Sequence, residues 1–97
     1  MSDVSKIPVQ FSDRAIEEIR KIYISKKVTS DFFLRVGVRG GGCGVTRIIG
    51  FDQIRPEDIS WEISGIKIIM DKRHMMHLIG SSVNFYEDEE RRGFLFE

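Results

Sequence analysis

Apolar positions recur at a helical period near the start of the chain and at a strand period over most of the rest. Between positions 13 and 26 they fall at i, i+1, i+4, i+7 and i+8, on one side of a helix: Ala15, Ile16, Ile19, Ile22 and Tyr23. Ser12 is the expected N-cap, and Asp13 suits the positive end of the helix dipole. The pattern predicts an N-terminal helix over about residues 13–26.

Alternation of apolar and polar residues begins after a polar break at residues 29–31. Phe33–Arg39 places Leu34, Val36 and Val38 on one face, which is typical of a half-buried strand. Thr46–Ile54 is a second β-rich run. We expect it to pair antiparallel with the first.

Two further alternating runs are separated by Ser64-Gly65, a pairing typical of a β-hairpin. The first run places Ile59, Trp61 and Ile63 on its apolar face; the second places Ile66, Ile68 and Met70 there and Lys67, Ile69 and Asp71 opposite. The pattern predicts a hairpin with one buried face.

The remaining segments are short. Residues 72–79 predict a short helix that ends at Gly80, and Val83–Tyr86 and Gly93–Phe96 predict two more strands. Residues 1–10 predict an extended lead-in with a short strand. The fold class is therefore α+β and β-rich, with six or seven strands in a single domain over residues 1–97.

Charge and composition narrow the function classes. Fifteen basic and fifteen acidic residues cancel, so no global field attracts nucleic acid or an anionic membrane. No apolar run approaches the roughly 20 residues that span a bilayer, and the N-terminus lacks a signal-peptide pattern. A single cysteine is compatible with the reducing cytosol. We expect a cytoplasmic protein without nucleic-acid or membrane partners.

The glycine-rich stretch Gly40–Gly44 contains that cysteine, Cys43. A thiolate is a soft ligand suited to iron–sulfur clusters, and loop N–H groups can donate hydrogen bonds to cluster sulfides. Arg39 and Arg47 are candidates for keeping the thiol ionised. The alternative is that Cys43 is a small, partly buried thiol in a tight turn.

Other candidate sites are weaker. His74 and His77 lie at i, i+3 on the predicted short helix, so the two side chains could face the same way. They are either metal ligands or ordinary surface or core-edge residues. The acidic run over residues 87–90 is more typical of a solvated loop than of a cation site. The glycines match neither a P-loop nor G-x-G-x-x-G, and no base is placed beside Cys43 for nucleophilic catalysis. The residues therefore give little support to phosphate binding or to a cysteine nucleophile.

The stretch from Leu34 to Cys43 resembles the signature of A-type iron–sulfur carriers, the HesB/IscA-like proteins. The resemblance extends in order from about Ser12 through Gly50-Phe51-Asp52, Asp71, Leu78-Ile79-Gly80 and Gly93-Phe94. It implies a HesB-like domain: small mixed β-sheets in a flattened sandwich or barrel-like arrangement, with an N-terminal helix and a short late helix.

The resemblance also implies a function. A non-catalytic carrier would bind a [2Fe–2S] or [4Fe–4S] cluster, or iron, through Cys43, with Gly41, Gly42 and Gly44 around it. It would act as a homodimer or tetramer, with scaffold and apo iron–sulfur proteins as partners. These residues and partners are expectations carried over from the family.

The chain departs from the family pattern in two places. Cys43 is followed directly by Gly44, where family members have Cys-Ser-Gly. The family pattern also has a Cys-Gly-Cys pair beyond the position of Glu97, so we expect either a longer natural chain or a member that lacks two ligands. Two alternatives follow: a HesB-fold protein that has lost cluster binding and serves as an interaction or regulatory module, or a redox-responsive single thiol.

Overall fold

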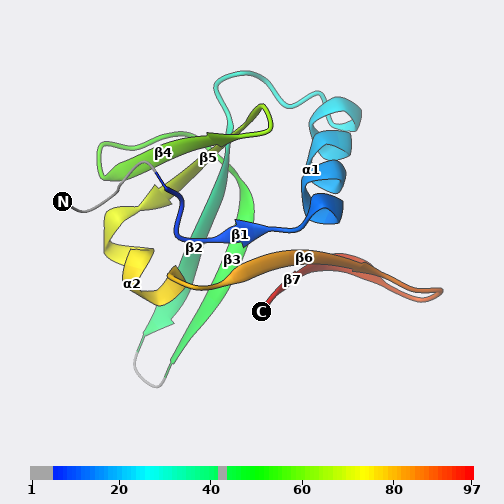
Figure 1. Ribbon diagram of the computed structural model, residues 1–97. Helices are drawn as coiled ribbons and strands as arrows, with labels where there is room; N and C mark the ends of the chain where they lie inside the picture. The colour runs from blue at the N-terminus through cyan, green and yellow to red at the C-terminus, as the bar shows by residue number, and fades with distance from the viewer. Residues whose placement is uncertain (1–5, 42–43) are drawn as a thin grey trace.

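The computed structural model describes residues 6–41 and 44–97, and within them two sheets, one long helix and one short helical segment (Figure 1). In chain order the elements are β1 (Gln10–Phe11), α1 (Asp13–Ser25), β2 (Phe33–Gly41), β3 (Gly44–Asp52), β4 (Asp58–Ile63), β5 (Ile66–Asp71), η1 (Lys72–His74), α2 (Met75–Leu78), β6 (Ser82–Glu87) and β7 (Arg92–Phe96). This strand-rich α+β arrangement confirms the predicted fold class.

Helix α1 begins and ends close to where the apolar period predicts. The Ser12 hydroxyl accepts a hydrogen bond from the Ala15 N–H at 3.1 Å, so Ser12 is the N-cap, as expected. The helix ends at Ser25, where Lys26 is the C-cap and Lys27 adopts a positive φ of 51°. Ile16 and Ile19 lie on its buried side.

The larger sheet has the strand order β3-β2-β5-β4. β2 pairs antiparallel with β3 along its whole length and parallel with β5 only at Leu34 and Arg35. The β4–β5 hairpin is confirmed: Ser64 and Gly65 have φ values of 51° and 82°, which two-residue hairpin turns require. β2 extends two residues beyond the predicted Arg39, because its last glycines still pair with β3.

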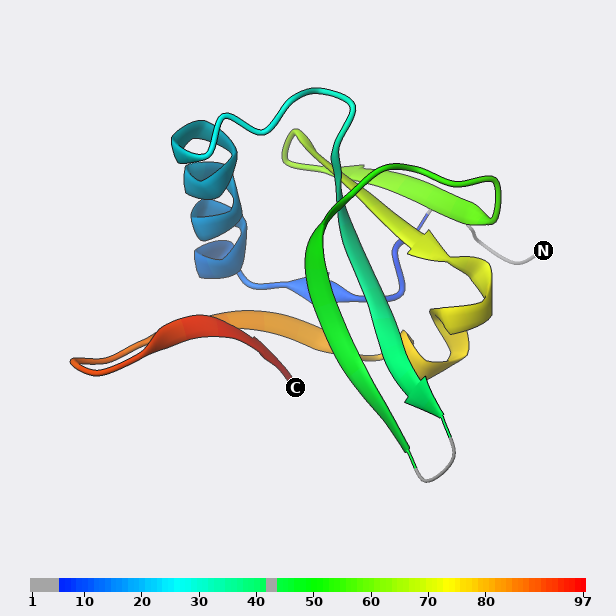
Figure 2. The ribbon, with the colours of Figure 1, turned by 180° about the vertical axis from the view of Figure 1, so that it is seen from behind.

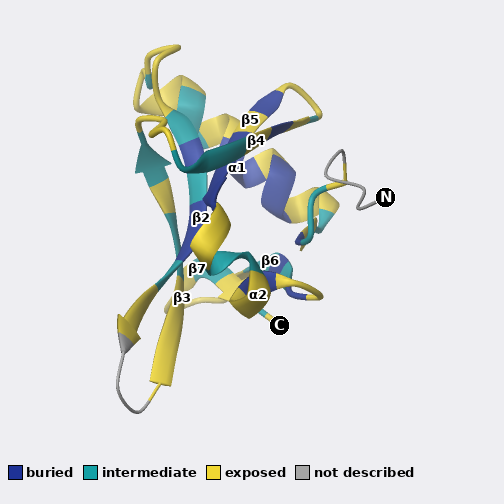
Figure 3. Cartoon of the chain, turned by 90° about the vertical axis from the view of Figure 1, so that its left-hand side faces the viewer, coloured by how far each residue is buried: buried dark blue, intermediate teal, exposed yellow. Residues whose placement is uncertain are grey.

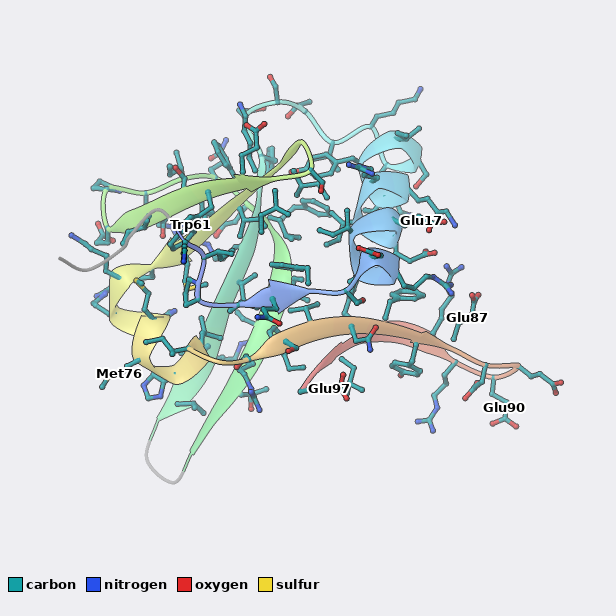
Figure 4. All side chains as sticks on the ribbon, viewed as in Figure 1. Glu17, Trp61, Met76, Glu87, Glu90 and Glu97 are labelled. Atoms are coloured by element: carbon teal, nitrogen blue, oxygen red, sulfur yellow. The ribbon has the colours of Figure 1, made fainter. Side chains whose placement is uncertain are left out.

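The smaller sheet has the order β1-β6-β7. The two residues of β1 pair parallel with Ser82 and Val83 of β6, and β6 and β7 form an antiparallel hairpin. This hairpin runs past the first turn of α1, where Arg14 donates to Glu87 at 2.6 Å (Figure 4). The short first strand therefore connects the helix to the second sheet.

The core lies between the larger sheet, α1 and the smaller sheet. Its buried side chains include Val9, Ile19, Val36, Trp61, Ile68, Leu78 and Val83, and partly buried side chains of β3 and β7 pack against them. Figure 3 shows this buried centre and the exposed outer parts of β2 and β3. Every residue on the apolar face predicted for β2, β4 and β5 packs in or against this core.

The sequence pattern places Ile69 and Asp71 on the same face of β5 as Lys67, opposite the predicted buried face. This second face is also largely buried. Ile69 is fully buried and Asp71 is only 5% exposed. β5 lies between β2 and β4, so Arg35 and Ser60 flank Ile69. A central strand is covered by its neighbours' side chains, which alternation along one strand cannot reveal.

The late helix is split. Residues 72–74 form the 3₁₀ segment η1, whose N-cap Asp71 accepts from the Arg73 N–H at 2.8 Å, and α2 follows directly. Gly80 lies just beyond α2, as predicted. Among the residues described, no helix is long and apolar enough to cross a membrane.

Candidate functional site

The β2–β3 hairpin carries the predicted site. Gly41 pairs with Gly44, so Gly42 and Cys43 are the two residues between the paired strand ends. Both lie outside the described residues. Arg39, Gly40 and the first four residues of β3 are exposed, and β2 and β3 run together past α2 and β6 (Figure 2). The described residues on either side of Gly42 and Cys43 are therefore exposed, at positions 39–40 and 44–47.

Gly40 is required by the backbone. Its φ is +113°, and a Cβ there would lie 2.8 Å from the carbonyl oxygen of Gly44 on the facing strand. Gly44 differs, because a Cβ added to it would meet nothing within 4 Å. At Gly40, therefore, the backbone conformation and the close approach of β3 account for the glycine without any role in cofactor binding. Roles for Gly41, Gly42 and Gly44 in cofactor binding stay predictions.

The two arginines near the turn differ. Arg47 donates to the Ser81 hydroxyl at 2.9 Å, and its guanidinium lies 5.8 Å from the ring centroid of Phe96. These contacts connect β3 to the smaller sheet. Arg39 is exposed. An effect of either arginine on the Cys43 thiol stays a prediction.

The two histidines occupy different environments. His74 is half-buried, and its Nδ1 accepts a long hydrogen bond, 3.4 Å, from the Val38 N–H of β2. His77 is exposed. Within residues 6–41 and 44–97, no group of three or more His, Cys, Asp or Glu residues could hold a metal ion. The described part of the chain thus offers no complete ligand set.

An ion-pair network that the sequence analysis missed supports the sheet next to the site. Arg35 on β2 donates to Asp52 at 2.8 Å, and to both carboxylate oxygens of Asp58 at 2.8 and 2.6 Å. The Asp58 side chain is 1% exposed. The hydrogen bonds from Arg35 hold the pKa of Asp58 below its usual range. In the sequence, the only indication of this network is an arginine inside a predicted strand. Asp52 lies diagonal to Arg35 across the β2–β3 pair.

A second acidic group lies where β5 ends. Asp71 forms a salt bridge with Arg73, at 2.6 Å between Oδ2 and Nη2, and caps η1. The Arg73 hydrogen bonds hold the pKa of Asp71 far below its usual range. Asp71 thereby fixes η1, and with it His74, against β2.

Known proteins match the chain over nearly all of its length. The family model for iron–sulphur cluster biosynthesis matches residues 7–97. The iron–sulfur cluster insertion protein ErpA of Yersinia enterocolitica is 33% identical, over 98% of this chain and 84% of that protein. ErpA of Photorhabdus laumondii is 34% identical over the same shares.

Solved structures share the fold. Escherichia coli SufA, involved in biosynthesis of iron–sulfur clusters, aligns with a TM-score of 0.75 at 22% identity, over 92% of this chain and 78% of that one. An Aquifex aeolicus protein aligns at 0.71 and 26%, over 100% and 97%. IscA with a [2Fe–2S] cluster aligns at 0.62 and 23%, over 92% and 80%. The resemblance in the sequence is confirmed: the chain belongs to the iron–sulphur cluster biosynthesis family.

Proposed function

We propose that this protein is an iron–sulfur cluster carrier that binds its cargo through Cys43 and passes it to apo-proteins. The observation that carries the proposal is the sequence position of the lone cysteine. In a member of this family, Cys43 joins two paired strands that are exposed at residues 39–40 and 44–47. Its relatives include ErpA, a cluster insertion protein, and its fold is that of IscA, solved with a [2Fe–2S] cluster. Both favour a cluster over a bare metal ion.

The ligand count argues for more than one chain. Common clusters are held by four ligands, usually thiolates, whereas the 97 residues of this sequence contain one cysteine. Two chains around one cluster supply two thiolates. Small thiols such as glutathione, or further protein groups, would complete the set. We therefore infer a homodimer or a higher oligomer as the loaded form.

Transfer would proceed by ligand exchange. Thiolates of the recipient would replace the ligands of the cluster one at a time: each new iron–sulfur bond forms as one to a Cys43 thiolate or to another ligand breaks, with no change of oxidation state. An exposed hairpin suits this step because the recipient can approach the cluster directly. The protein is then not an enzyme, and its partners are scaffold and apo iron–sulfur proteins of the cytoplasm. The balance of fifteen basic and fifteen acidic residues gives no support to nucleic-acid or membrane binding.

A specific observation favours a second candidate function. Cys43 is followed directly by Gly44, where the family pattern has Cys-Ser-Gly, and an altered cysteine loop suits a family member that has lost cluster binding. Such a protein would use the same fold as an interaction or regulatory module. The two candidates differ in whether the purified protein takes up a cluster.

Anaerobic reconstitution with ferrous iron, sulfide and a small thiol separates them. The carrier should develop visible charge-transfer absorption, which Cys43→Ser abolishes. Val45→Ser, at an exposed position of the same hairpin, is the matched control and should retain the absorption. If the wild-type protein and Cys43→Ser both stay colourless, the carrier proposal is wrong and the module is favoured.

A further inference from the structure

Along the edge that faces β5, β2 is paired with that strand only near its own N-terminal end. Parallel pairing with β5 covers only Leu34 and Arg35, although β2 continues to Gly41. β5 ends at Asp71, where the chain turns into η1 and α2. The part of β2 that leads to the Cys43 turn therefore depends on η1 and α2 along this edge.

His74 takes over from β5 along this edge. Its Nδ1 accepts the Val38 N–H at 3.4 Å, a hydrogen bond that a longer β5 would otherwise provide. Since Nδ1 is the acceptor, the neutral ring carries its proton on Nε2. The imidazole Nδ1 thus takes the place of a backbone carbonyl oxygen of a neighbouring strand.

Gly37 makes the space that the imidazole occupies. A Cβ at Gly37 would lie 3.3 Å from His74 Nδ1 and 3.9 Å from its Cε1, so the ring packs directly on the backbone of this buried residue. The φ of Gly37 is not in the left-handed region. The absence of a side chain, and not the backbone conformation, is what this position needs.

The segment that carries His74 is held firmly. Asp71 receives the Arg73 N–H at 2.8 Å and the Arg73 guanidinium at 3.0 and 2.6 Å. On the other side of His74, Leu78 of α2 is fully buried in the core. Met76, between them, points away from the fold (Figure 4). The backbone that carries the imidazole is therefore anchored on both sides of His74.

We propose that His74 is the positioning residue of the cluster-binding hairpin. By accepting the Val38 N–H and packing on Gly37, it fixes the direction in which β2 leaves the sheet and hence the presentation of Cys43. The effect of His74 on cluster retention rests on the proposed function. The local contact itself can be measured without any cluster.

The first measurement is hydrogen exchange at the Val38 amide of the metal-free protein. His74→Ala should speed exchange about three- to tenfold, the range that one hydrogen bond supplies. His74→Asn should restore protection, because its Oδ1 can occupy the place of Nδ1. His77→Ala, which changes an exposed histidine three residues on, should leave exchange unchanged. Equal exchange in His74→Ala and wild type would overturn the proposal.

The second measurement is the loss of a reconstituted cluster to a chelator. His74→Ala should lose it about three- to tenfold faster than wild type, with altered visible circular dichroism, and His74→Asn should recover both. Unaltered loss and circular dichroism in His74→Ala would refute the positioning role while leaving the carrier function intact. A wild-type protein that takes up no cluster, with the Val38 result still positive, would refute the carrier function alone.

Gly37→Ala gives an independent test should His74→Ala fold poorly. The added methyl displaces the ring, so this variant should reproduce the fast Val38 exchange. In Gly37→Ala/His74→Ala the methyl has no ring to displace, so the double variant should be no worse than either single variant. Additive effects would show that the two residues act separately and would contradict the proposed contact.

Discussion

The ion pair between Arg35 and Asp58 should be a major stabilising contact of the larger sheet. Arg35 lies on β2, beside Ile69 of β5, and binds Asp52 of β3 and Asp58 of β4, so its contacts join three strands of the sheet. The Asp58 side chain is 1% exposed and also accepts the Arg55 N–H at 2.7 Å. Asp58→Asn keeps this shape but turns one acceptor oxygen into an NH₂ donor that faces the guanidinium.

The expected loss can be worked from these contacts. Breaking one partner of a buried ion pair costs about 3–5 kcal/mol. Arg35 keeps its hydrogen bonds to Asp52 and to the carbonyl of Gln53, so we expect a loss below that range, about 2–3 kcal/mol of unfolding free energy. For a domain of this size the melting temperature should fall by about 8–24 °C.

Urea and thermal unfolding followed by circular dichroism measure this loss. Glu62→Gln, on the same strand but exposed, is the matched control and should stay within about 0.5 kcal/mol of wild type. An Asp58→Asn variant as stable as the control would refute the account of this network.

Acid should act on the same contact. The Arg35 hydrogen bonds lower the pKa of Asp58 in the folded state. Its contribution is therefore complete above the unfolded-state pKa of about 3.9 and is lost as the pH falls toward the folded-state value. Wild type should lose more stability than Asp58→Asn when the pH falls from about 5 to 3; parallel curves would contradict this.

Two further substitutions test the local geometry. Ser12→Ala removes the α1 N-cap and a hydrogen bond to Asn84, so the free energy of unfolding should fall by about 0.5–2 kcal/mol in a urea titration, whereas a normal value would deny the cap its role. Gly40→Ala, at φ +113°, should lower the melting temperature more than Gly44→Ala, where space is open; the reverse order in thermal unfolding would contradict the hairpin geometry.

Local features of the fold are predictable from sequence because their causes are local. The period of the apolar residues and Ser12 determine the position of α1, and the Ser64-Gly65 turn determines the β4–β5 register. Strand order depends on contacts between segments far apart in the chain. The burial of Ile69 follows from that order, and so it could not be predicted from alternation.

The candidate site divides in the same way. Cys43 could be named from the sequence because a lone thiol among glycines is a local pattern with a known chemistry. Its surroundings could not, because the contacts of Arg35 with Asp58 and of His74 with Val38 join residues 23 and 36 positions apart. The spacing of His74 and His77 on a helix is compatible with a shared metal site, whereas the hydrogen bond that His74 accepts depends on the position of β2, a distant segment of the chain.

Transfer of a cluster to an apo-protein through Cys43 is the step on which the proposed function depends. Wild-type protein, reconstituted anaerobically and freed of unbound iron and sulfide, is mixed with an apo-ferredoxin, and the ferredoxin's circular dichroism is followed in the presence of a chelator. The wild-type protein should fill the ferredoxin despite the chelator, whereas Cys43→Ser protein treated in the same way should not. Filling that is equally fast with wild type and Cys43→Ser, or no filling with either, would contradict the proposed function.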